Sequence, residues 1–216
     1  MKQHFEFDRK KAKQRLIIGT DEAGRGPGAG GVFAAAVYFP DTSEKIVSML
    51  ENLDDSKKLT EKKREELFEI IVENAVYSIH SISVEEIERI NILQASLLAM
   101  KRSVLDVKKQ LNSDNLHVLI DGRQLIPSLG LSQEFIIKGD SKSASVAAAS
   151  ILAKVSRDRY MYEMDKKFPQ YYFAQNKGYL TLKHLDAIDR YGLCPIHRPS
   201  FLKKHFEMSK QLTLGI

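Results

Sequence analysis

The sequence predicts an α/β fold in which a mixed five-stranded sheet is flanked by helices and followed by a small helical C-terminal part. Three observations lead to this class. Five short segments are apolar and rich in β-branched residues, and longer segments between them repeat apolar residues at helical spacing. Their order is two strands, helix, strand, helix, two strands, helix. This order indicates a sheet with both parallel and antiparallel neighbours.

The first two strands are expected to form a hairpin across a glycine-rich turn. The apolar residues 16–18 lead into Asp21, and residues 32–39 form a second apolar run that Pro40 ends. Glycines dominate the segment between the two runs, and glycine adopts the backbone angles of tight turns at little cost. We therefore expect the two strands to be antiparallel neighbours.

A helix, a strand and further helical sequence follow the hairpin. Thr60 is expected to cap the first helix, because its side-chain oxygen can accept from a free backbone N–H of the first turn. Residues 76–82 alternate apolar and polar side chains as a strand does, and residues 83–86 have the pattern of a capping box. Apolar positions continue at helical spacing over 92–105, so we expect the helical sequence to run on past Asn91.

The second half of the chain predicts two strands, a long helix and a helical end. Residues 116–120 end at Asp121-Gly122, and residues 134–138 end at Gly139-Asp140. A helix is expected from about 143 to 167, where an alanine run gives a thin face that can approach the sheet closely. Helical sequence from Thr181 opens a C-terminal extension over about 181–216, and we expect residues 1–216 to form one domain.

Composition excludes several classes of protein. Cys194 is the single cysteine, so neither an intramolecular disulfide nor a thiolate zinc cluster can form. The N-terminus lacks the apolar segment of a signal peptide, and no run of about 18 apolar residues occurs, so we expect a cytoplasmic protein without a membrane segment. Lys and Arg number 33 against 28 Asp and Glu, and the resulting net charge of +5 favours a polyanionic partner.

The segment 19–31 combines residues that bind metal with residues that bind phosphate. Asp21 and Glu22 are adjacent at the end of an apolar run, and carboxylate oxygens are ligands that Mg²⁺ and Mn²⁺ prefer. Arg25 lies in the glycine-rich turn that follows. Because glycine has no Cβ, the backbone N–H groups of such a turn can approach a sugar-phosphate closely.

Four acids follow or end predicted strands: Asp21, Glu22, Asp121 and Asp140. Ligand sites of α/β sheets gather at the carboxyl ends of strands. Four carboxylates at one place repel one another unless cations neutralise them, so the pattern predicts a metal site. Taken singly, these acids have other uses, because Asp121-Gly122 is an ordinary turn dipeptide and Asp140 could cap the next helix.

These residues, together with further segments, make the chain resemble the ribonuclease HII family, the type 2 ribonucleases H. Its glycine turn carries the run Asp21-Glu22-Ala23-Gly24-Arg25-Gly26-Pro27. The further matching segments, in one consistent order, are Asp55-Ser56-Lys57-Lys58-Leu59, Asn91-Ile92-Leu93-Gln94-Ala95 with Ala99-Met100, Asp121-Gly122, Lys138-Gly139-Asp140, Ala147 to Val155, Arg157-Asp158, Lys177-Gly178-Tyr179, His197-Arg198 and Ser200-Phe201. The chain departs from the usual pattern at Leu180, where such proteins have glycine, and at Gly28 and Gly31, where they have leucine and proline. The first departure could reshape the loop of Tyr179, and the others are expected to affect only the hairpin.

The resemblance implies an RNase H-like fold and an endonuclease that cuts the RNA strand of RNA/DNA hybrids and at single ribonucleotides in duplex DNA, leaving 5′-phosphate and 3′-hydroxyl ends. It implies that Asp21, Glu22, Asp121 and Asp140 bind two Mg²⁺ or Mn²⁺ ions during catalysis. It further implies that Gly24, Arg25 and Gly26 contact the ribose 2′-hydroxyl and its phosphate, and that Tyr179 packs on the following deoxyribose. Lys57, Lys58, Ser141 and Lys177 are additional candidates for substrate binding. The simplest expected assembly is a monomer.

Other interpretations of the same residues remain open at this stage. Residues 26–31 also satisfy the G-x-G-x-x-G pattern of dinucleotide-binding oxidoreductases, although an apparent strand follows them where that motif needs a helix. A hybrid-binding module without catalysis is a second alternative. Ribonuclease HIII is a third, but it carries an extra N-terminal domain, and only about fifteen residues precede the first strand here. We expect His184 to be an ordinary helix residue, and His197 and Arg198 to be structural hydrogen-bonding residues.

Overall fold

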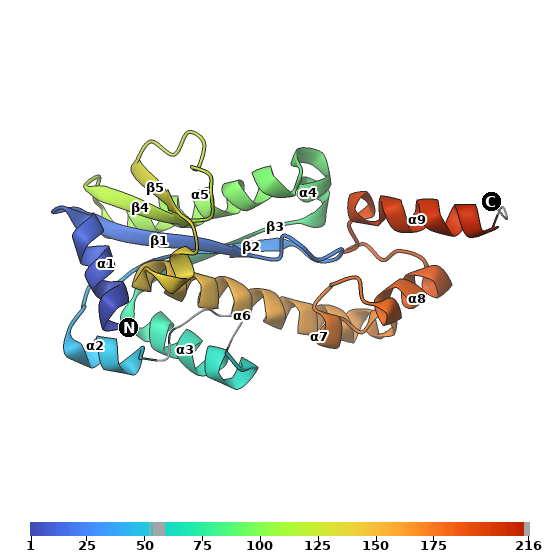
Figure 1. Ribbon diagram of the computed structural model, residues 1–216, viewed down its shortest axis with the longest axis horizontal. Helices are drawn as coiled ribbons and strands as arrows, with labels where there is room; N and C mark the ends of the chain where they lie inside the picture. Colours follow the sequence, from blue (N-terminus) through green and yellow to red (C-terminus); the bar gives the residue numbers. More distant parts are fainter. Residues whose placement is uncertain (52, 54–58, 214–216) are drawn as a thin grey trace.

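A five-stranded sheet with the strand order β3-β2-β1-β4-β5 lies at the centre of the molecule (Figure 1). The computed structural model describes residues 1–51, 53 and 59–213. Strand β1 is antiparallel to β2, which is antiparallel to β3, whereas β4 is parallel to β1 and β5 is parallel to β4. The strands are β1 (Leu16–Ala23), β2 (Val32–Tyr38), β3 (Val76–Ile82), β4 (Leu116–Asp121) and β5 (Ser132–Ile136). The carboxyl ends of β1, β4 and β5 therefore meet at one edge of the sheet.

Helices cover both faces of the sheet, and a group of helices lies beyond one end of it (Figure 1). Helix α6 packs on β1 and β2 from one side, and α5 packs on β2 and β3 from the other. The helices are α1 (Lys2–Ala12), α2 (Glu44–Met49), α3 (Glu61–Asn74), α4 (Val84–Ile90), α5 (Ile92–Leu111), α6 (Ala144–Lys167), α7 (Phe173–Asn176), α8 (Leu182–Tyr191) and α9 (Pro199–Thr213), with short 3₁₀ turns η1 (Gly139–Ser141) and η2 (Pro169–Tyr171). The predicted α/β class and the five-stranded mixed sheet are confirmed.

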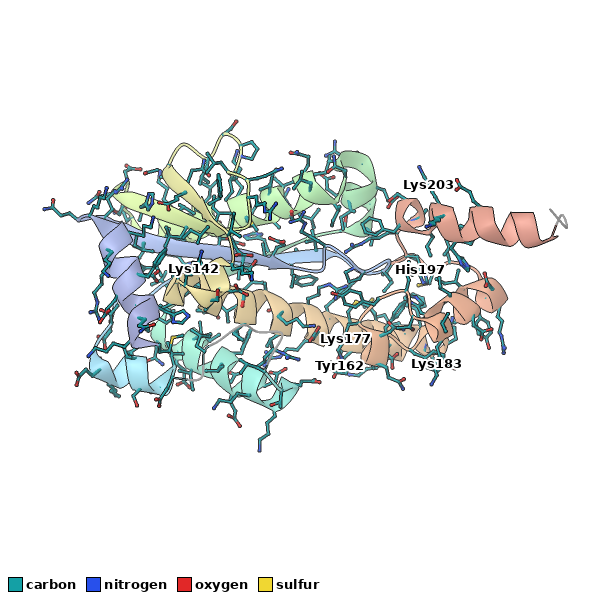
Figure 2. The ribbon with its side chains drawn as sticks, viewed as in Figure 1. Lys142, Tyr162, Lys177, Lys183, His197 and Lys203 are labelled. Carbon is teal, nitrogen blue, oxygen red and sulfur yellow. The ribbon has the colours of Figure 1, made fainter. Side chains whose placement is uncertain are left out.

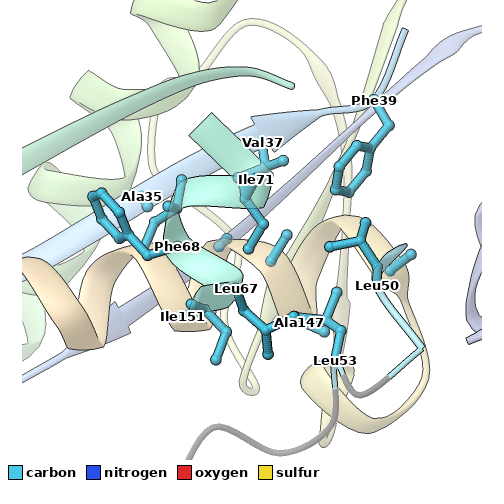
Figure 3. Close-up of a cluster of buried hydrophobic side chains, with 14 of the residues drawn as sticks. Ala35, Val37, Phe39, Leu50, Leu53, Leu67, Phe68, Ile71, Ala147 and Ile151 are labelled. Carbon is cyan, nitrogen blue, oxygen red and sulfur yellow. The ribbon is translucent and has the colours of Figure 1, made fainter. Parts of the chain in front are cut away.

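The hydrophobic core consists of two main layers that the alternation of β2 separates. Ala35 and Val37 face α3 and α6, whereas Ala34 and Ala36 face α5. On the first side, Leu67, Phe68 and Ile71 of α3 pack with Ala147 and Ile151 of α6 (Figure 3). Burying a leucine or isoleucine side chain of this kind stabilises the fold by about 1.5 to 3 kcal/mol.

A glycine in β1 lets α6 lie directly on the sheet. A Cβ added to Gly19 would be 2.2 Å from the backbone carbon of Ser145, at the first turn of α6. No side chain fits there, so residue 19 has to be glycine for the helix to reach this depth. The alanine run of α6 presents the thin face that was expected. The helix start, with Ser143 accepting from the N–H of Val146, is thereby held beside the strand ends.

Several boundaries differ from the predicted ones. The helical sequence after Ser83 is broken at Asn91, whose φ of 67° ends α4 and whose side chain accepts from Leu93 and Gln94 to begin α5. Strand β5 begins two residues earlier than predicted and ends at Ile136. Helices α1 and α2 were not expected, because neither has a clear apolar stripe. Helix α1 is fixed instead by buried Phe5 and by Asp8, whose carboxylate accepts from the N–H of Ser145.

Residues 26–31 lead into strand β2 and not into a helix, so the dinucleotide-binding interpretation is wrong. Within the described part of the chain, no helix combines the length and apolar character needed to cross a bilayer.

Candidate active site

A cavity of about 460 Å³ opens where β1 and β4 end. The strands, the glycine turn, α3, α6 and the loop before α8 all contribute to its wall. Its lining residues are Asp21, Glu22, Ala23, Gly24, Arg25, Gly26, Arg64, Asp121, Asp140, Ser150, Lys154, Arg157 and Tyr179. The cavity therefore joins all four acids of the predicted metal site to Tyr179 and to the glycine turn that carries Arg25, also called the arginine turn.

The parallel pairing of β1 with β4 brings two of the acids together. Thr20 is level with Ile120, so Asp21 and Asp121 occupy equivalent positions at the ends of neighbouring strands. Each lies two residues beyond a position that packs against the start of α6, namely Gly19 for Asp21 and Leu119 for Asp121. Because side chains alternate along a strand, Asp21 and Asp121 also point toward α6. The N–H of Gly139 donates to Oδ1 of Asp121 at 2.7 Å, which holds η1, and with it Asp140, against the end of β4.

Asp21 is the electrostatic centre of the acidic group. It is 7% exposed, and its Oδ1 accepts from the N–H of Glu22 at 2.7 Å. Burial raises the pKa of Asp21 well above its usual value, and the charges of Glu22, Asp121 and Asp140 raise the pKa further. All four carboxylates line the same cavity, in agreement with the strand pattern.

The donor set suits a hard divalent cation. All four side chains offer carboxylate oxygens, and the mutual repulsion that raises the pKa of Asp21 is the kind that a bound cation relieves. Among the residues that the structure describes, no three histidine, cysteine or acidic side chains are arranged to hold one ion as they stand. Binding of Mg²⁺ or Mn²⁺ would therefore require these side chains to turn toward a common point.

Two buried arginines give the glycine turn its shape. Arg198 is fully buried, and its guanidinium donates to four carbonyl oxygens: those of Gly24 (2.8 Å), Arg25 (3.3 Å), Pro27 (2.8 Å) and Gly30 (2.6 and 2.8 Å). Burial and the neighbouring Arg157 lower the pKa of Arg198 to about 9, which leaves it cationic at pH 7. The turn is thus folded around one planar cation, which confirms that Arg198 has a structural role.

Arg157 of α6 completes this support from the opposite direction. It donates to the carbonyls of Ala29 (3.1 Å), Gly31 (3.3 Å) and Lys177 (3.0 Å), and so joins the turn to the loop before α8. Gly24 has a φ of 100°, and a Cβ there would be 2.2 Å from Nε of Arg157. Any larger residue at position 24 would displace the arginine. Arg25, in contrast, is exposed, with Nη1 3.3 Å from a carboxylate oxygen of Glu22.

Tyr179 lies at the rim of the cavity with 53% of its surface exposed. Its Cε1 is 3.5 Å from the point where a Cβ of Gly26 would lie, so the ring stands beside the arginine turn. The carbonyl of Tyr179 accepts from Nδ1 of His184 at 2.9 Å. A hydrogen-bonded histidine pair therefore sets the backbone of the residue that presents this ring.

The histidine pair is buried and neutral, and its protons can be placed. The N–H of Cys194 donates to Nδ1 of His197 at 2.8 Å, so the proton of His197 is on Nε2 and donates to Nε2 of His184 at 3.0 Å. His184 then carries its proton on Nδ1, which donates to Tyr179. The expectation that His184 is an ordinary helix residue is wrong, because its side chain is fully buried and hydrogen-bonded to His197. The sequence could not show this pair, which depends on contacts across the fold. His197, labelled in Figure 2, is a structural hydrogen-bonding residue as expected.

The histidine pair is expected to make the protein less stable in acid. Burial, and then the nearby His184, lower the pKa of His197 from 6.5 to about 4. The unfolded chain therefore binds this proton first, and the free energy of unfolding falls as the pH drops from 6.5 to 4. Between pH 7 and 4.5 the loss attributable to His197 is about 2 kcal/mol. Burial raises the pKa of Asp8 to about 6, which opposes the loss, because the folded chain binds that proton first.

Urea unfolding of the wild type and of His197→Asn at pH 7 and 4.5 measures this contribution. Asparagine keeps an acceptor for the N–H of Cys194 but does not titrate. The variant is expected to be less stable at pH 7 and to lose about 2 kcal/mol less than the wild type on acidification. The same pH dependence in both proteins would contradict the neutral buried assignment, since Asp8 titrates equally in the two.

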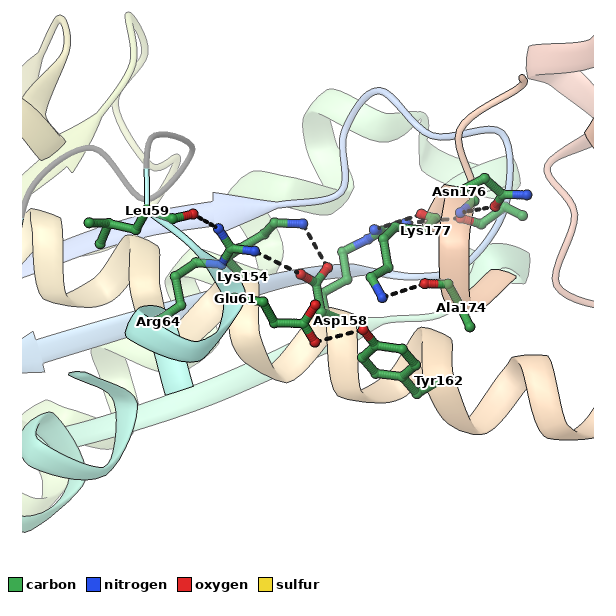
Figure 4. Close-up of polar contacts among 12 residues, drawn as sticks. Leu59, Glu61, Arg64, Lys154, Asp158, Tyr162, Ala174, Asn176 and Lys177 are labelled. Carbon is green, nitrogen blue, oxygen red and sulfur yellow. Dashed lines mark hydrogen bonds and ion pairs between the residues drawn. The ribbon is translucent and has the colours of Figure 1, made fainter. Parts of the chain in front are cut away.

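A second buried acid holds cations at the wall of the cavity. Asp158 is 4% exposed, and its carboxylate lies 2.7 Å from Nζ of Lys154 and 3.9 Å from Nη2 of Arg64 (Figure 4). Both cations line the cavity. The acidic group at the strand ends therefore faces a cationic wall from α3 and α6, an arrangement that suits a substrate carrying phosphates.

The structure places eight of the twelve predicted site residues on the cavity and two elsewhere. Nζ of Lys177 bonds the carbonyl of Ala174 at 2.6 Å and lies 3.3 Å from the ring centre of Tyr162 (Figure 2). Oγ of Ser141 donates to the carbonyl of Lys138 at 2.9 Å. Neither residue lines the cavity. Lys57 and Lys58 lie outside the described residues.

The prediction missed Arg64, Ser150, Lys154 and Arg157 as cavity residues. Lys154 and Arg157 carried a signal, because they are charged positions three residues apart that directly follow the alanine-rich apolar stretch of the helix. Such spacing puts them on one face, where a buried charge needs a purpose. Arg64 carried no comparable signal, since α3 has several exposed charges.

Comparisons with known proteins show which family and which fold this chain resembles. The family model described as Ribonuclease HII matches residues 18–208. A ribonuclease HII of Endomicrobium trichonymphae is 50% identical over 200 residues, which cover 91% of each chain. The structure of the PCNA:RNase HII complex from Archaeoglobus fulgidus matches with a TM-score of 0.68 and 25% identity over 85% of this chain and 93% of that chain. Bst-RNase HIII in complex with Mn²⁺ shares the fold, with a TM-score of 0.72 and 19% identity over 94% of this chain and 72% of that chain.

Proposed function

This chain belongs to the ribonuclease HII family, and on that premise we propose that it is a metal-dependent endonuclease acting on RNA joined to or paired with DNA. It cuts the RNA strand of RNA/DNA hybrids and incises at ribonucleotides embedded in duplex DNA, as a monomer in which residues 1–216 act as one catalytic unit. The observation that carries the proposal is the single cavity that joins four carboxylates to an exposed arginine turn and a tyrosine.

The four carboxylates have the role of metal ligands in this proposal. Asp21, Glu22, Asp121 and Asp140 would hold two Mg²⁺ or Mn²⁺ ions, which when bound lower the pKa of an attacking water and neutralise charge on the leaving 3′-oxygen. The products would carry 5′-phosphate and 3′-hydroxyl ends. Burial of Asp21 keeps water away from one side of the acidic group, and Lys154 and Arg64 offer positive charge to the backbone phosphates.

Recognition of ribose requires a separate device, because metal ligands do not distinguish RNA from DNA. The 2′-hydroxyl is the group that differs. We propose that Gly24, Arg25 and Gly26 contact this hydroxyl and the adjoining phosphate, and that Tyr179 packs on the following deoxyribose. The two buried arginines support this role, because they hold the turn in one shape before substrate binds. Lys57, Lys58, Ser141 and Lys177 stay predicted contacts, and Lys177 would have to leave Ala174 to reach a phosphate.

To test the proposal, the protein is incubated with a labelled DNA duplex that contains one ribonucleotide. We expect one cut at that nucleotide with Mg²⁺ or Mn²⁺, none in EDTA, and recovery when excess Mg²⁺ is added. Mapping the ends distinguishes 5′-phosphate and 3′-hydroxyl products from other chemistries. Binding of the duplex without any cleavage under all metal conditions would support a hybrid-binding module and overturn the proposal.

Replacement of Arg25 by alanine is expected to weaken discrimination for ribose. Loss of a charge-assisted hydrogen bond costs about 1.5 to 3 kcal/mol, so the preference should fall by about tenfold or more. Cleavage rates are compared on duplexes that carry ribose or 2′-deoxy-2′-fluororibose at the same position. Arg190→Ala is the matched control, because Arg190 is an exposed arginine of α8 that forms an ion pair with Asp186 of the same helix. An unchanged ribose preference in Arg25→Ala would remove Arg25 from recognition.

A further inference from the structure

The loop that carries Tyr179 packs on the glycine turn, and two of its residues contact Gly28. The N–H of Gly28 donates to the carbonyl of Gly178 at 2.9 Å, which fixes the residue before Tyr179. The residue after it, Leu180, lies on the same spot, because a Cβ added to Gly28 would be 2.6 Å from Cδ2, 2.7 Å from Cγ and 3.0 Å from Cδ1 of Leu180. Both neighbours of Tyr179 are therefore seated on Gly28.

The leucine reaches Gly28 only because position 28 has no side chain. All three atoms nearest to the added Cβ belong to Leu180, and Gly28 is not among the glycines with a positive φ. The backbone at position 28 would therefore accept alanine, and Leu180 is the obstacle. This contact corrects the expectation that Gly28 affects only the hairpin, since it touches the loop of Tyr179.

Tyr179 itself has few contacts that could fix its ring. More than half of its surface is exposed, and its carbonyl and N–H are held by His184 and by the carbonyl of Asn176. Those bonds fix the backbone of Tyr179 to α7 and α8 but do not hold its ring. Leu180 is half-buried and packs against the cluster that contains Ala29 and Met161, and so it ties the same loop to the turn and to α6.

We propose that Leu180, seated on Gly28, is a positioning residue that sets where the ring of Tyr179 stands beside the arginine turn. This inference rests on the proposed function, in which Tyr179 packs on the sugar that follows the ribonucleotide. Leu180 therefore sets the preference for a deoxyribose at that position. It governs the ratio between cleavage at a single ribonucleotide in DNA and cleavage of a continuous hybrid, since the following sugar is deoxyribose in the first and ribose in the second.

A double-mutant cycle on Gly28→Ala and Leu180→Ala tests the pair. The measured quantity is kcat/KM on the single-ribonucleotide duplex divided by kcat/KM on the continuous hybrid. Gly28→Ala pushes Leu180 away and is expected to lower this ratio by about tenfold, because a displacement of about 1 Å is enough for such losses. Leu180→Ala removes the packing of residue 180 on the turn and should lower the ratio by several fold. The double variant is expected to recover most of the ratio lost in Gly28→Ala, because the shortened side chain leaves room for the new methyl group.

Controls separate positioning from general damage. Leu182→Ala removes the same atoms from a leucine two residues away that is 86% exposed, and it should leave the ratio unchanged. Thermal unfolding identifies any variant that fails to fold. Leu180→Ala creates no steric overlap, so it still tests the inference if Gly28→Ala does not fold. The inference would be overturned if the double variant lowered the ratio by the product of the two single effects, which would show that the residues act independently. It would also be overturned if no variant changed the ratio.

A readout without catalysis separates this inference from the proposed function. In protein labelled with 3-fluorotyrosine, the ¹⁹F resonance of Tyr179, assigned with Tyr179→Phe, should shift in Gly28→Ala and return toward its original position in the double variant. This pattern in a protein that cuts no duplex would uphold the positioning role and reject the nuclease proposal. Normal cutting by the wild type with no shift in any variant would reject the positioning role alone.

Discussion

Asp21→Asn is expected to reduce cleavage by about a thousandfold or more and to raise the stability of the protein at the same time. The loss follows because an amide replaces the most buried carboxylate of the proposed metal site. The gain follows because burial and three neighbouring acids already disfavour the charge of Asp21, and asparagine keeps an oxygen for the N–H of Glu22. We expect a gain of about 1 kcal/mol, measured by thermal unfolding in EDTA.

Two further variants make this result specific. Asp140→Asn should show the same loss of cleavage while hybrid binding is largely retained. Asp114→Asn is the matched control, since its side chain is 91% exposed and forms a surface ion pair with Lys108, and it should change neither quantity appreciably. Undiminished cleavage by Asp21→Asn or Asp140→Asn would remove that residue from the mechanism, and a stability loss in Asp21→Asn would contradict the electrostatic account.

Arg198→Met is expected to destabilise the protein by about 3 to 5 kcal/mol, the largest stability effect we predict. Methionine fills similar space but donates nothing, so the buried carbonyls of Gly24, Pro27 and Gly30 lose their donors. Arg198→Lys should be intermediate, because one ammonium cannot reproduce the planar fork that reaches several carbonyls. Urea unfolding at pH 7 measures the differences.

The same substitution should impair catalysis even where the variant is folded. The turn that carries Arg25 would lose its fixed shape, and we expect cleavage to fall by about a hundredfold at a temperature well below the unfolding transition. Arg190→Met is the matched control, with a side chain that is 68% exposed. Stability within 1 kcal/mol of the wild type in Arg198→Met would show that water or a rearranged turn replaces the arginine.

The strands and the acidic group could be predicted because local patterns determine them. Each strand is a short apolar run with a clear end, and Asp21 and Asp121 lie near the ends of such runs. Ligands gather at the carboxyl ends of parallel strands whatever the details of packing, so convergence of these acids followed from position alone. The caps Thr60 and Ser83 were equally local, since each bonds an N–H three residues ahead.

The parts that could not be predicted depend on contacts between distant segments. Arg198 bonds carbonyls more than 160 residues earlier in the chain, and a carbonyl leaves no trace in the sequence. Glycines 24 and 28 resemble ordinary turn residues until Arg157 and Leu180 are seen to fill the space beside them. Helix α1 has too few apolar positions to be recognised from the sequence. It is held by buried Phe5, by the partly buried Phe7 and Ala12, and by the carboxylate of Asp8.

The dependence of the glycine turn on Arg198 has a consequence for protein synthesis. The ribosome makes β1, β2 and α6 well before it reaches residue 198, and early segments can begin to fold as they emerge. A nascent polypeptide that ends at α8 already carries all four acids but lacks the guanidinium around which the turn closes. A chain that has not yet reached residue 198 therefore lacks the donors that hold this turn, and we expect the turn to close only after Arg198 has been made.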